Sequence, residues 1–285
     1  MIVQAHRLHP QLSVQQLCDL FAVSRSWYYE QLNHLPDEEE LALRDEIERI
    51  ILEFPGYGYR RVTRALHRQG QFVNHKRVLR IMREESLLCH LKKRFVVKTT
   101  DSHHRLPVYP NALAGMQLER LDQAWVADIT YIRLNNAFVY LACLLDAFSR
   151  RCVGWHLSHE MTTSLPLAAL RQAVLARHPG SGLIHHSDRG VQYASQAYVE
   201  QLKQIGAVIS MSDVDNPYDN AKAESFFKTL KQEEVYLKDY QSFADAQANL
   251  MVFIEKVYNV KRLHSSLGYL PPVEFEALYT SLPRS

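Results

Sequence analysis

Apolar residues recur along the chain with two different periods, and the change of period separates a helical first part from a mixed second part. Up to about residue 90 they recur every three or four positions, which is typical of amphipathic helices. This spacing, with Gly, Pro and Ser breaks, predicts one helix-turn-helix over residues 13–29. It predicts a second helix-turn-helix arrangement with helices over residues 40–53, 61–68 and 74–86.

From residue 123 the chain changes to runs of strand-forming residues alternating with helical patterns. Three strands followed by alternating helices and strands indicate a mixed α/β domain with helices packed on a sheet. The expected strands are 125–132, 138–145, 152–157, a short strand from 183 that ends at Asp188, and 208–211. The expected helices are 165–176, 195–205, 221–235 and 242–258.

These patterns and the breaks between them predict five segments. The first boundary follows from the turn at residues 33–36 and the acidic run that begins at Asp37. The expected segments are a helix-turn-helix segment at 1–35, a second helical DNA-binding domain at 37–90, a basic linker at 91–117, an α/β core at 118–240 and a C-terminal helix and tail at 241–285.

Composition excludes several classes of protein. The longest apolar run, residues 137–145, is far shorter than the roughly 20 residues that cross a bilayer, and the N-terminus lacks a signal-peptide pattern. The four cysteines stand far apart without a C-x-x-C pair, which argues against a disulfide framework and a structural zinc site. We therefore expect a cytoplasmic protein without membrane contact.

Positive charge is concentrated in one part of the chain, although the formal net charge is only +2. Residues 54–105 contain 13 Lys or Arg and 3 acidic residues. Such a concentration is typical of a surface that follows a phosphate backbone, although a solvated basic helix face gives the same pattern. The candidate DNA-binding residues here are Arg60, Arg61, Lys76, Arg77, Arg80, Lys92, Lys93 and Arg94.

Three acidic residues fall at element ends where distant parts of an α/β chain can converge. Asp128 lies in the first expected strand, Asp188 follows a buried strand and Glu224 lies near a helix start. Converging carboxylates supply hard oxygen ligands for Mg²⁺ or Mn²⁺, and two such ions can promote phosphoryl transfer. Surface acids and helix caps are the alternative interpretation. A zinc site is disfavoured, because the sequence contains neither an H-E-x-x-H motif nor a His/Cys cluster with the spacing of a zinc finger.

Other polar residues near these acids have simpler interpretations. We expect a structural role for Asp146, strand-end packing or DNA contact for His185 and His186, and either phosphate binding or a local ion pair for Arg189. Capping explains Asp219 and Asn220 as well as chemistry does. His264 either contacts DNA or packs, and Trp125 and Trp155 are expected in the core.

Several motifs, in order along nearly the whole chain, resemble one known family. WVADITY at 125–131, HSDRG at 186–190 and DNAKAESFF at 219–227 surround the three acids. The spacing, with 59 residues between Asp128 and Asp188 and 35 between Asp188 and Glu224, resembles that of retroviral-integrase-like DDE transposases. With YGYRR at 57–61 and HSSLGY at 264–269, these motifs closely resemble the second-frame (OrfB) transposases of the IS-three group of bacterial insertion sequences.

This resemblance implies a ribonuclease-H-like catalytic core at 118–240 after the helix-turn-helix modules. It implies that Asp128, Asp188 and Glu224 bind the catalytic metals, expected to be two Mg²⁺ ions with Mn²⁺ as a substitute. Lys231, on the same helix face as Glu224, matches a basic residue associated with the active site and DNA ends, and Lys228 is a further DNA-binding candidate.

The reaction implied is cleavage at insertion-sequence ends and strand transfer by a freed 3′-hydroxyl, hence DNA transposition, recombination and integration. The implied partners are the double-stranded DNA of the terminal repeats and of the target, further copies of the chain on DNA, and an upstream-frame (OrfA-like) protein or fusion. The implied location is the bacterial nucleoid. Two alternatives are a DNA-binding regulator with an inactive core and a ribonuclease-H-like nuclease.

Overall fold

The computed structural model describes residues 2–33, 38–89, 106–135, 137–213 and 220–281 of the 285-residue chain. Its first unit consists of α1 (Ile2–Leu8), α2 (Val14–Leu20) and α3 (Arg25–Asn33). Ser13 begins α2 with a capping box, in which its side chain accepts from the Gln16 backbone and the Gln16 side chain accepts from the Ser13 backbone. The three helices enclose a small core of Ile2, Leu17, Cys18 and Tyr28. The sequence did not predict α1.

A second helical unit follows, with α4 (Glu38–Glu53), α5 (Tyr59–Arg68) and α6 (His75–Glu84). The three expected helices are confirmed to within a few residues. Asn74 caps α6 by accepting a hydrogen bond from the Lys76 backbone N–H. The apolar stripes of the helices meet in a core that contains Ile47, Val62 and Met82, and Leu263 from the far end of the chain joins it.

The second half of the chain is built on one five-stranded sheet in the order β3-β2-β1-β4-β5. β1 pairs antiparallel with β2, β2 antiparallel with β3, and β4 runs parallel to both β1 and β5. This topology is ribonuclease-H-like, as the family resemblance implied. The strands are β1 (Ala124–Arg133), β2 (Phe138–Asp146), β3 (Cys152–Ser158), β4 (Ile184–Ser187) and β5 (Val208–Met211).

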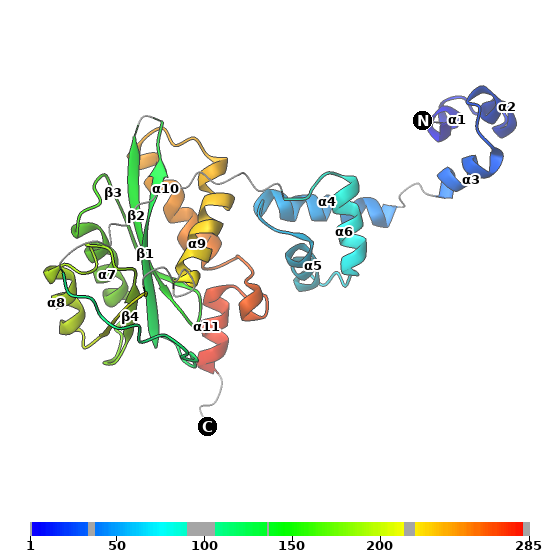
Figure 1. Cartoon of the computed structure of the whole chain (residues 1–285). Helices are drawn as coiled ribbons and strands as arrows, with labels where there is room; N and C mark the ends of the chain where they lie inside the picture. Colours follow the sequence, from blue (N-terminus) through cyan, green and yellow to red (C-terminus); the bar gives the residue numbers. More distant parts are fainter. Residues whose placement is uncertain (1, 34–37, 90–105, 136, 214–219, 282–285) are drawn as a thin grey trace.

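Helices cover both faces of the sheet, as Figure 1 shows. Because side chains alternate between the faces of a strand, Val126 of β1 packs on one side and Trp125 on the other. The Val126 side is covered by α9 (Ala221–Glu233) and α10 (Phe243–Met251), and the Trp125 side by α7 (Ser164–Arg177) and α8 (Gln196–Gln204). The expected helices 165–176, 195–205 and 221–235 are thereby confirmed.

The C-terminal part departs most from the sequence-based expectations. The single helix expected over 242–258 ends as α-helix at Met251 and continues as a π-helix over Val252–Tyr258. After a short 3-10 turn, Ser265–Leu267, the expected tail contains a further helix, α11 (Pro272–Ser281). Glu276 fastens α11 to the sheet domain through Arg151 and Arg177. The remaining 3-10 turn, Val235–Leu237, follows α9.

Within the described ranges, no helix is both long and apolar enough to span a bilayer.

Candidate functional site

Asp128 lies in β1, on the face of the sheet that α9 covers, because it shares the strand parity of Val126. Its side chain is half-buried, and its Oδ1 accepts a hydrogen bond of 2.8 Å from the Ile129 backbone N–H. A carboxyl group thus stands in the middle strand of the sheet, where the neighbouring positions Ala127 and Val126 are fully buried.

Asp188 follows directly after β4, the parallel neighbour of β1. The paired residues are offset by 60 positions, since Ala124 faces Ile184 and Val126 faces His186. Continued beyond β4, this register places Asp188 beside Asp128, on chains about 4.8 Å apart. The two aspartates therefore adjoin because of the strand register.

The loop after Asp188 holds the carboxylate through the backbone of Gly190. The Gly190 N–H donates to Asp188 Oδ1 at 3.0 Å, and a Cβ atom at position 190 would lie only 2.9 Å from that oxygen. Glycine is needed here because of this close approach.

Glu224 lies in the first turn of α9 and is exposed. The preceding Asn220, for which capping and chemistry were equally good interpretations, occupies the N-cap position of α9, but its side chain makes no capping hydrogen bond. Instead, the buried Asn220 side chain donates from Nδ2 to the backbone oxygen of Ala127 at 3.2 Å. This contact joins the start of α9 to β1 one residue before Asp128. Asp219 lies outside the described residues.

The electrostatics of Asp128 link the three acids. Its pKa is raised from 3.8 to about 8, chiefly by burial and then by the negative charges of Asp188 and Glu224. The Ile129 N–H and the positive charge of Lys231 act in the opposite direction. The three carboxyl groups therefore repel one another across a shared site when no cation is present.

The donor set fits a hard divalent cation, because it consists of carboxylate oxygens whose repulsion a cation would remove. Among the described residues, however, no three His, Cys, Asp or Glu side chains are gathered closely enough to hold one metal ion as they stand. The strand register brings Asp128 and Asp188 together, and α9 carries Glu224 to the same face of the sheet.

The two basic candidates on α9 differ in their surroundings. Lys231 Nζ lies 4.2 Å from the ring centre of Tyr131 in β1, in a cation–π contact close to the acids. Lys228, one turn after Glu224, is exposed. Both side chains belong to the helix that presents Glu224.

The basic candidates of the helical unit and the linker fall into three groups, apart from Arg61. Arg60 and Lys76 are exposed. Arg77 and Arg80 already pair with carboxylates of α4, since both contact Glu40 and Arg77 also contacts Glu39. Lys92, Lys93 and Arg94 lie outside the described residues.

Arg61 is half-buried, unlike the exposed Arg60 beside it. Its Nε donates to the backbone oxygen of Leu263 at 3.1 Å, and burial is the main cause of its lowered pKa. We conclude that Arg61 connects the helical unit to the C-terminal segment.

Sequence reasoning missed a buried joint between the helical unit and α9, which we call the Glu233–Arg262 joint. Glu233, at the end of α9, receives two hydrogen bonds of 2.8 and 2.7 Å from Arg262, and both side chains are about 5% exposed or less. Gly56 packs against it so closely that a Cβ atom would lie 2.2 Å from Glu233 Oε1. The Tyr57 hydroxyl accepts from the Leu263 N–H at 2.7 Å. The only sequence signal was the pair of family motifs at 57–61 and 264–269, whose structural role the sequence alone does not reveal.

The neighbouring polar residues are mostly structural. Asp146 is fully buried and accepts backbone hydrogen bonds from Asp122, Phe148 and Ser149, which supports its expected structural role. His185 is buried against Tyr198, whose hydroxyl lies 2.9 Å from His185 Nε2. Burial lowers the pKa of His185 to about 3.

The structure also shows the surroundings of His186, Arg189 and His264, for each of which the sequence left two interpretations open. His186 lies between Ser210 and Ser212, at 2.8 and 3.1 Å. Arg189 forms an ion pair with Asp213 at 3.1 Å. His264 is buried and packs edge-to-face on Tyr258, so packing is the better interpretation.

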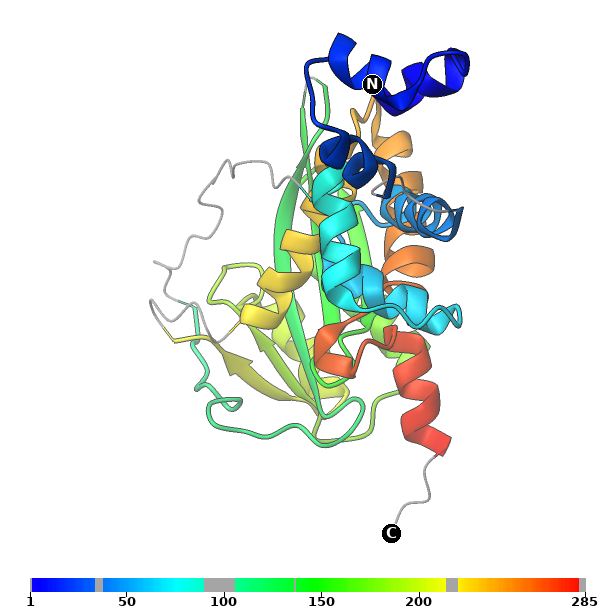
Figure 2. The ribbon, with the colours of Figure 1, turned by 90° about the vertical axis from the view of Figure 1, so that its right-hand side faces the viewer.

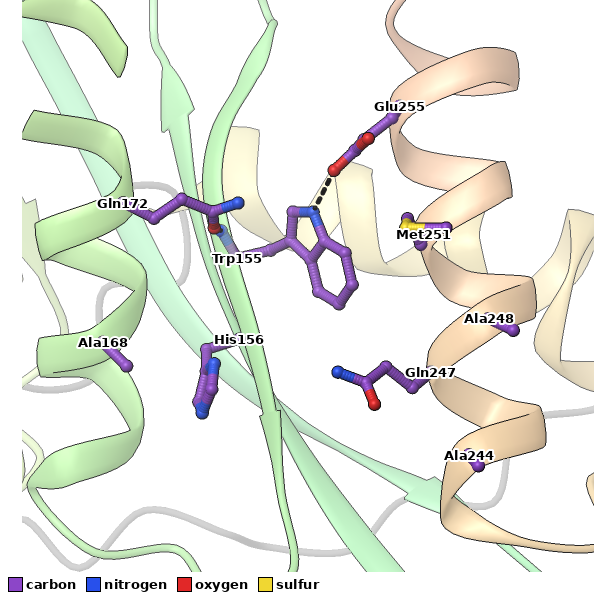
Figure 3. A pocket seen from close by; sticks show the side chains of 9 residues that line it. All are labelled: Trp155, His156, Ala168, Gln172, Ala244, Gln247, Ala248, Met251 and Glu255. Carbon is purple, nitrogen blue, oxygen red and sulfur yellow. Dashed lines mark hydrogen bonds between the residues drawn. The ribbon is translucent and has the colours of Figure 1, made fainter. Parts of the chain in front are cut away.

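Trp125 is fully buried, as expected, whereas Trp155 is only partly buried and packs against the margin of the core. Trp155 lies on the edge strand β3 and lines a hollow of about 450 Å³ between α7 and α10 (Figure 3). Its indole N–H donates to Glu255 Oε1 at 3.2 Å. The alternating pattern of β3 does not reveal the partial exposure of Trp155, because the strand lies at the edge of the sheet.

Comparison with known protein families gives three matches. An integrase core domain family matches residues 119–217, a second family with the same description matches residues 205–272, and an HTH-like domain family matches residues 37–95.

Several curated bacterial proteins are similar over nearly their whole length. The IS600 uncharacterized 31 kDa protein of Shigella sonnei is 37% identical, over 92% of this chain and 98% of that protein. The transposase for IS629 of Shigella sonnei is 36% identical, over 96% and 94%. The transposase InsF for IS3A of Escherichia coli K12 is 33% identical, over 93% and 94%.

Solved structures give looser likenesses. The catalytic core domain of BIV integrase covers 56% of this chain and 96% of that chain with 19% identity and a TM-score of 0.42. The HTLV-2 integrase catalytic core domain, solved in complex with magnesium, covers 55% and 97% with 16% identity and a TM-score of 0.41.

Proposed function

The chain belongs to the IS3-family insertion-sequence transposases with an integrase core domain, and from this premise we propose that Asp128, Asp188 and Glu224 carry its phosphoryl-transfer chemistry. As a DNA transposase it is a polynucleotidyl transferase. The proposed reaction is cleavage of DNA at the ends of the element, followed by strand transfer from the freed 3′-hydroxyl.

The observation that best supports the assignment is the register of β1 and β4, in which Asp188 is the residue level with Asp128, while α9, which bears Glu224, packs on the face of the sheet to which Asp128 belongs. Enzymes of this family use divalent metal, and we propose two Mg²⁺ ions, with Mn²⁺ as a substitute. When bound, such ions stabilise the attacking and leaving oxygens of a phosphodiester. The three carboxylates would hold them, Gly190 would orient Asp188, and Asn220 would keep Glu224 near β1.

As a transposase the protein binds DNA, and the finer division of labour is proposed here. Lys228 and Lys231 would hold the DNA strand beside the carboxylates, while Arg60 and Lys76 would contact phosphates from the helical unit. Arg60 and Lys76 are exposed, which supports their proposed contact with phosphates. Arg61 is half-buried and donates a hydrogen bond to the backbone of Leu263 instead.

We further propose the domain division 1–35, 37–90, 91–117, 118–240 and 241–285. The proposed partners are terminal-repeat and target DNA, further copies of this chain, and an upstream-frame protein or fusion. The proposed location is the bacterial nucleoid, without membrane association. The bacterial relatives and the HTH-like and integrase core matches support these assignments.

A cellular end-joining assay tests the catalytic assignment. A plasmid that carries the gene's native flanking DNA is probed for joined element ends with wild-type protein and with Glu224→Gln. We expect joined ends with the wild type and at least a hundredfold fewer, on the order of the loss caused by removing one catalytic group, with Glu224→Gln. The matched control is Glu200→Gln, which removes an exposed carboxylate on α8 and should retain activity.

Equal joining by the wild type and Glu224→Gln would overturn the role of Glu224. If neither protein joins ends, the assay is repeated with the upstream frame fused, and joining restored only in the fused wild type supports the assignment together with the need for that partner.

A further inference from the structure

A hollow of about 520 Å³ lies where the end of β1 and the start of β2 meet the end of α9, and the proposed chemistry does not use it. It is within the size range of small-molecule pockets. Aromatic and basic side chains dominate its lining, which includes Tyr131, Arg133, Phe138, Lys231, Tyr236 and Lys238. We call it the β1–α9 pocket.

The pocket lies within reach of the proposed catalytic acids. The backbone of Tyr131 is three residues after that of Asp128 along β1, about 10 Å in a strand, and Lys231 of α9 reaches the Tyr131 ring. Lys231 is seven residues after Glu224 along α9, again about 10 Å in a helix. This separation corresponds to about three nucleotide steps at 3.4 Å each. A DNA strand whose phosphodiester lies at the acids can therefore reach the pocket with a nearby nucleotide.

The lining offers both ring faces and positive charge. Phe138 is 48% exposed, and its ring meets Tyr131 edge-to-face with centres 5.7 Å apart. Lys231 covers Tyr131 at 4.2 Å, which leaves Phe138 as the more exposed ring of the pair. Arg133 and Lys238 add positive charge, and among the described residues Asp239 is the only acidic side chain that lines the pocket. Exposed aromatic rings beside cations are how proteins hold unpaired nucleobases and their phosphates.

A paired base inside a duplex presents only its edges, whereas an unstacked base presents a face that can stack on a ring. We propose that the β1–α9 pocket binds an unpaired nucleobase of the DNA strand next to the reacting phosphodiester, stacked on Phe138 with its phosphate near Arg133 or Lys238. This inference rests on the proposed function for the identity of the ligand as DNA. It adds a site that opens the duplex end beside the reacting bond.

The test measures binding rather than cleavage, so its result is separate from that of the end-joining assay. Full-length protein carrying Glu224→Gln is titrated, by fluorescence anisotropy, into two duplexes made from the native flanking DNA. One duplex is fully paired at the element end, and the other has three unpaired nucleotides there. We expect the unpaired end to bind about tenfold more tightly, as one base stacked on an aromatic ring allows.

Three substitutions of Phe138 separate stacking from apolar contact. Phe138→Ala and Phe138→Leu should each lose the preference for the unpaired end, whereas Phe138→Trp should retain it. Because Phe138 is half exposed, these changes should leave the fold intact, which far-ultraviolet circular dichroism checks. The matched control is Leu175→Ala, an exposed apolar residue on α7 that should keep the preference.

An abasic scan of the first five nucleotides beside the reacting phosphodiester identifies the base. One abasic position should weaken binding about tenfold in the protein with Phe138 and have little effect in Phe138→Ala, because the two changes remove the same contact. The inference is overturned if paired and unpaired ends bind equally, or if Phe138→Leu keeps the full preference. It is also overturned if every abasic effect persists unchanged in Phe138→Ala.

Discussion

Asp128 is the residue whose ionisation the fold changes most clearly within the site. Burial and the charges of Asp188 and Glu224 raise its pKa from 3.8 to about 8. In the metal-free native protein Asp128 therefore keeps its proton over a range where the unfolded chain has lost it. Folding stability falls as the pH rises from about 4 to about 8, because the native state binds the extra proton. Above that range this loss is complete.

We expect Asp128→Asn to stabilise the metal-free protein at pH 8.5 by roughly 2 kcal/mol, since an amide cannot ionise. This value is smaller than the full shift would give because Asp128 as a residue is only half-buried. Thermal unfolding in a chelator at pH 4.5 and 8.5 measures the effect, and the gain should be small at the lower pH. Added Mg²⁺ should stabilise the wild type more than the variant.

Glu200→Gln on α8 is the control and should leave the pH dependence unchanged. An identical pH dependence in Asp128→Asn and the wild type would contradict the assigned origin of the shift.

At the scale of single elements, α9 is the helix on which the proposed site depends. It presents Glu224 in its first turn and Lys231 in its last. Its start is joined to β1 by the hydrogen bond from Asn220 to Ala127, and its end is joined to Arg262 through Glu233. Since a helix behaves as a nearly rigid rod, fixing both ends also fixes the position of Glu224.

We expect Asn220→Ala to lower the rate of end cleavage by about ten- to a hundredfold, because a displacement near 1 Å in a catalytic group has effects of this size. Asn220 acts through position, so the loss should appear in kcat while DNA affinity stays close to that of the wild type. Single-turnover cleavage and anisotropy measure the two quantities. Asn249→Ala, which removes an amide bonded within α10, should leave both unchanged. A loss confined to DNA affinity would refute this role.

At the scale of the whole molecule, the C-terminal segment unites the helical unit with the sheet domain. Figure 2, turned from the view of Figure 1, shows the α4–α6 unit in front of the sheet domain, with α11 below it. Leu263 completes the core of the helical unit, while Arg262 beside it pairs with Glu233 of α9. Arg68 of α5 also contacts Glu274 of α11 at 2.6 Å. The HTH-like unit is thus attached to the helix that bears Glu224.

We expect Arg262→Met to lower the free energy of unfolding by about 3–5 kcal/mol, because it leaves Glu233 buried without its partner. The double variant Glu233→Met with Arg262→Met should recover most of that loss. Chemical denaturation of the single and double variants measures this. The control is Lys261→Met, which breaks the exposed pair with Glu53 and should cost less than about 1 kcal/mol. Equal losses of unfolding free energy in Arg262→Met and Lys261→Met would contradict the stabilising role of the Glu233–Arg262 joint.

The sequence by itself determined most of the helices and strands and indicated the three candidate acids. Apolar residues at every third or fourth position identified α4, α5 and α6, and runs of strand-forming residues identified β1, β2 and β3. These elements could be predicted because the burial pattern of a helix or strand is visible in neighbouring residues of the sequence. The motifs around Asp128, Asp188 and Glu224 pointed to the family, to which the chain belongs.

Only the tertiary structure decided how these parts meet, since contacts between distant residues leave no period in the sequence. The register of β1 with β4 brings Asp188 level with Asp128, and the Asn220 side chain, for which the sequence left capping and chemistry open, instead donates a hydrogen bond to β1. Arg61 looked like a DNA contact by its charge alone, yet it lies against the backbone of Leu263. Charge and spacing identify which groups can react or bind, whereas packing decides which of them face a neighbour and which face the solvent.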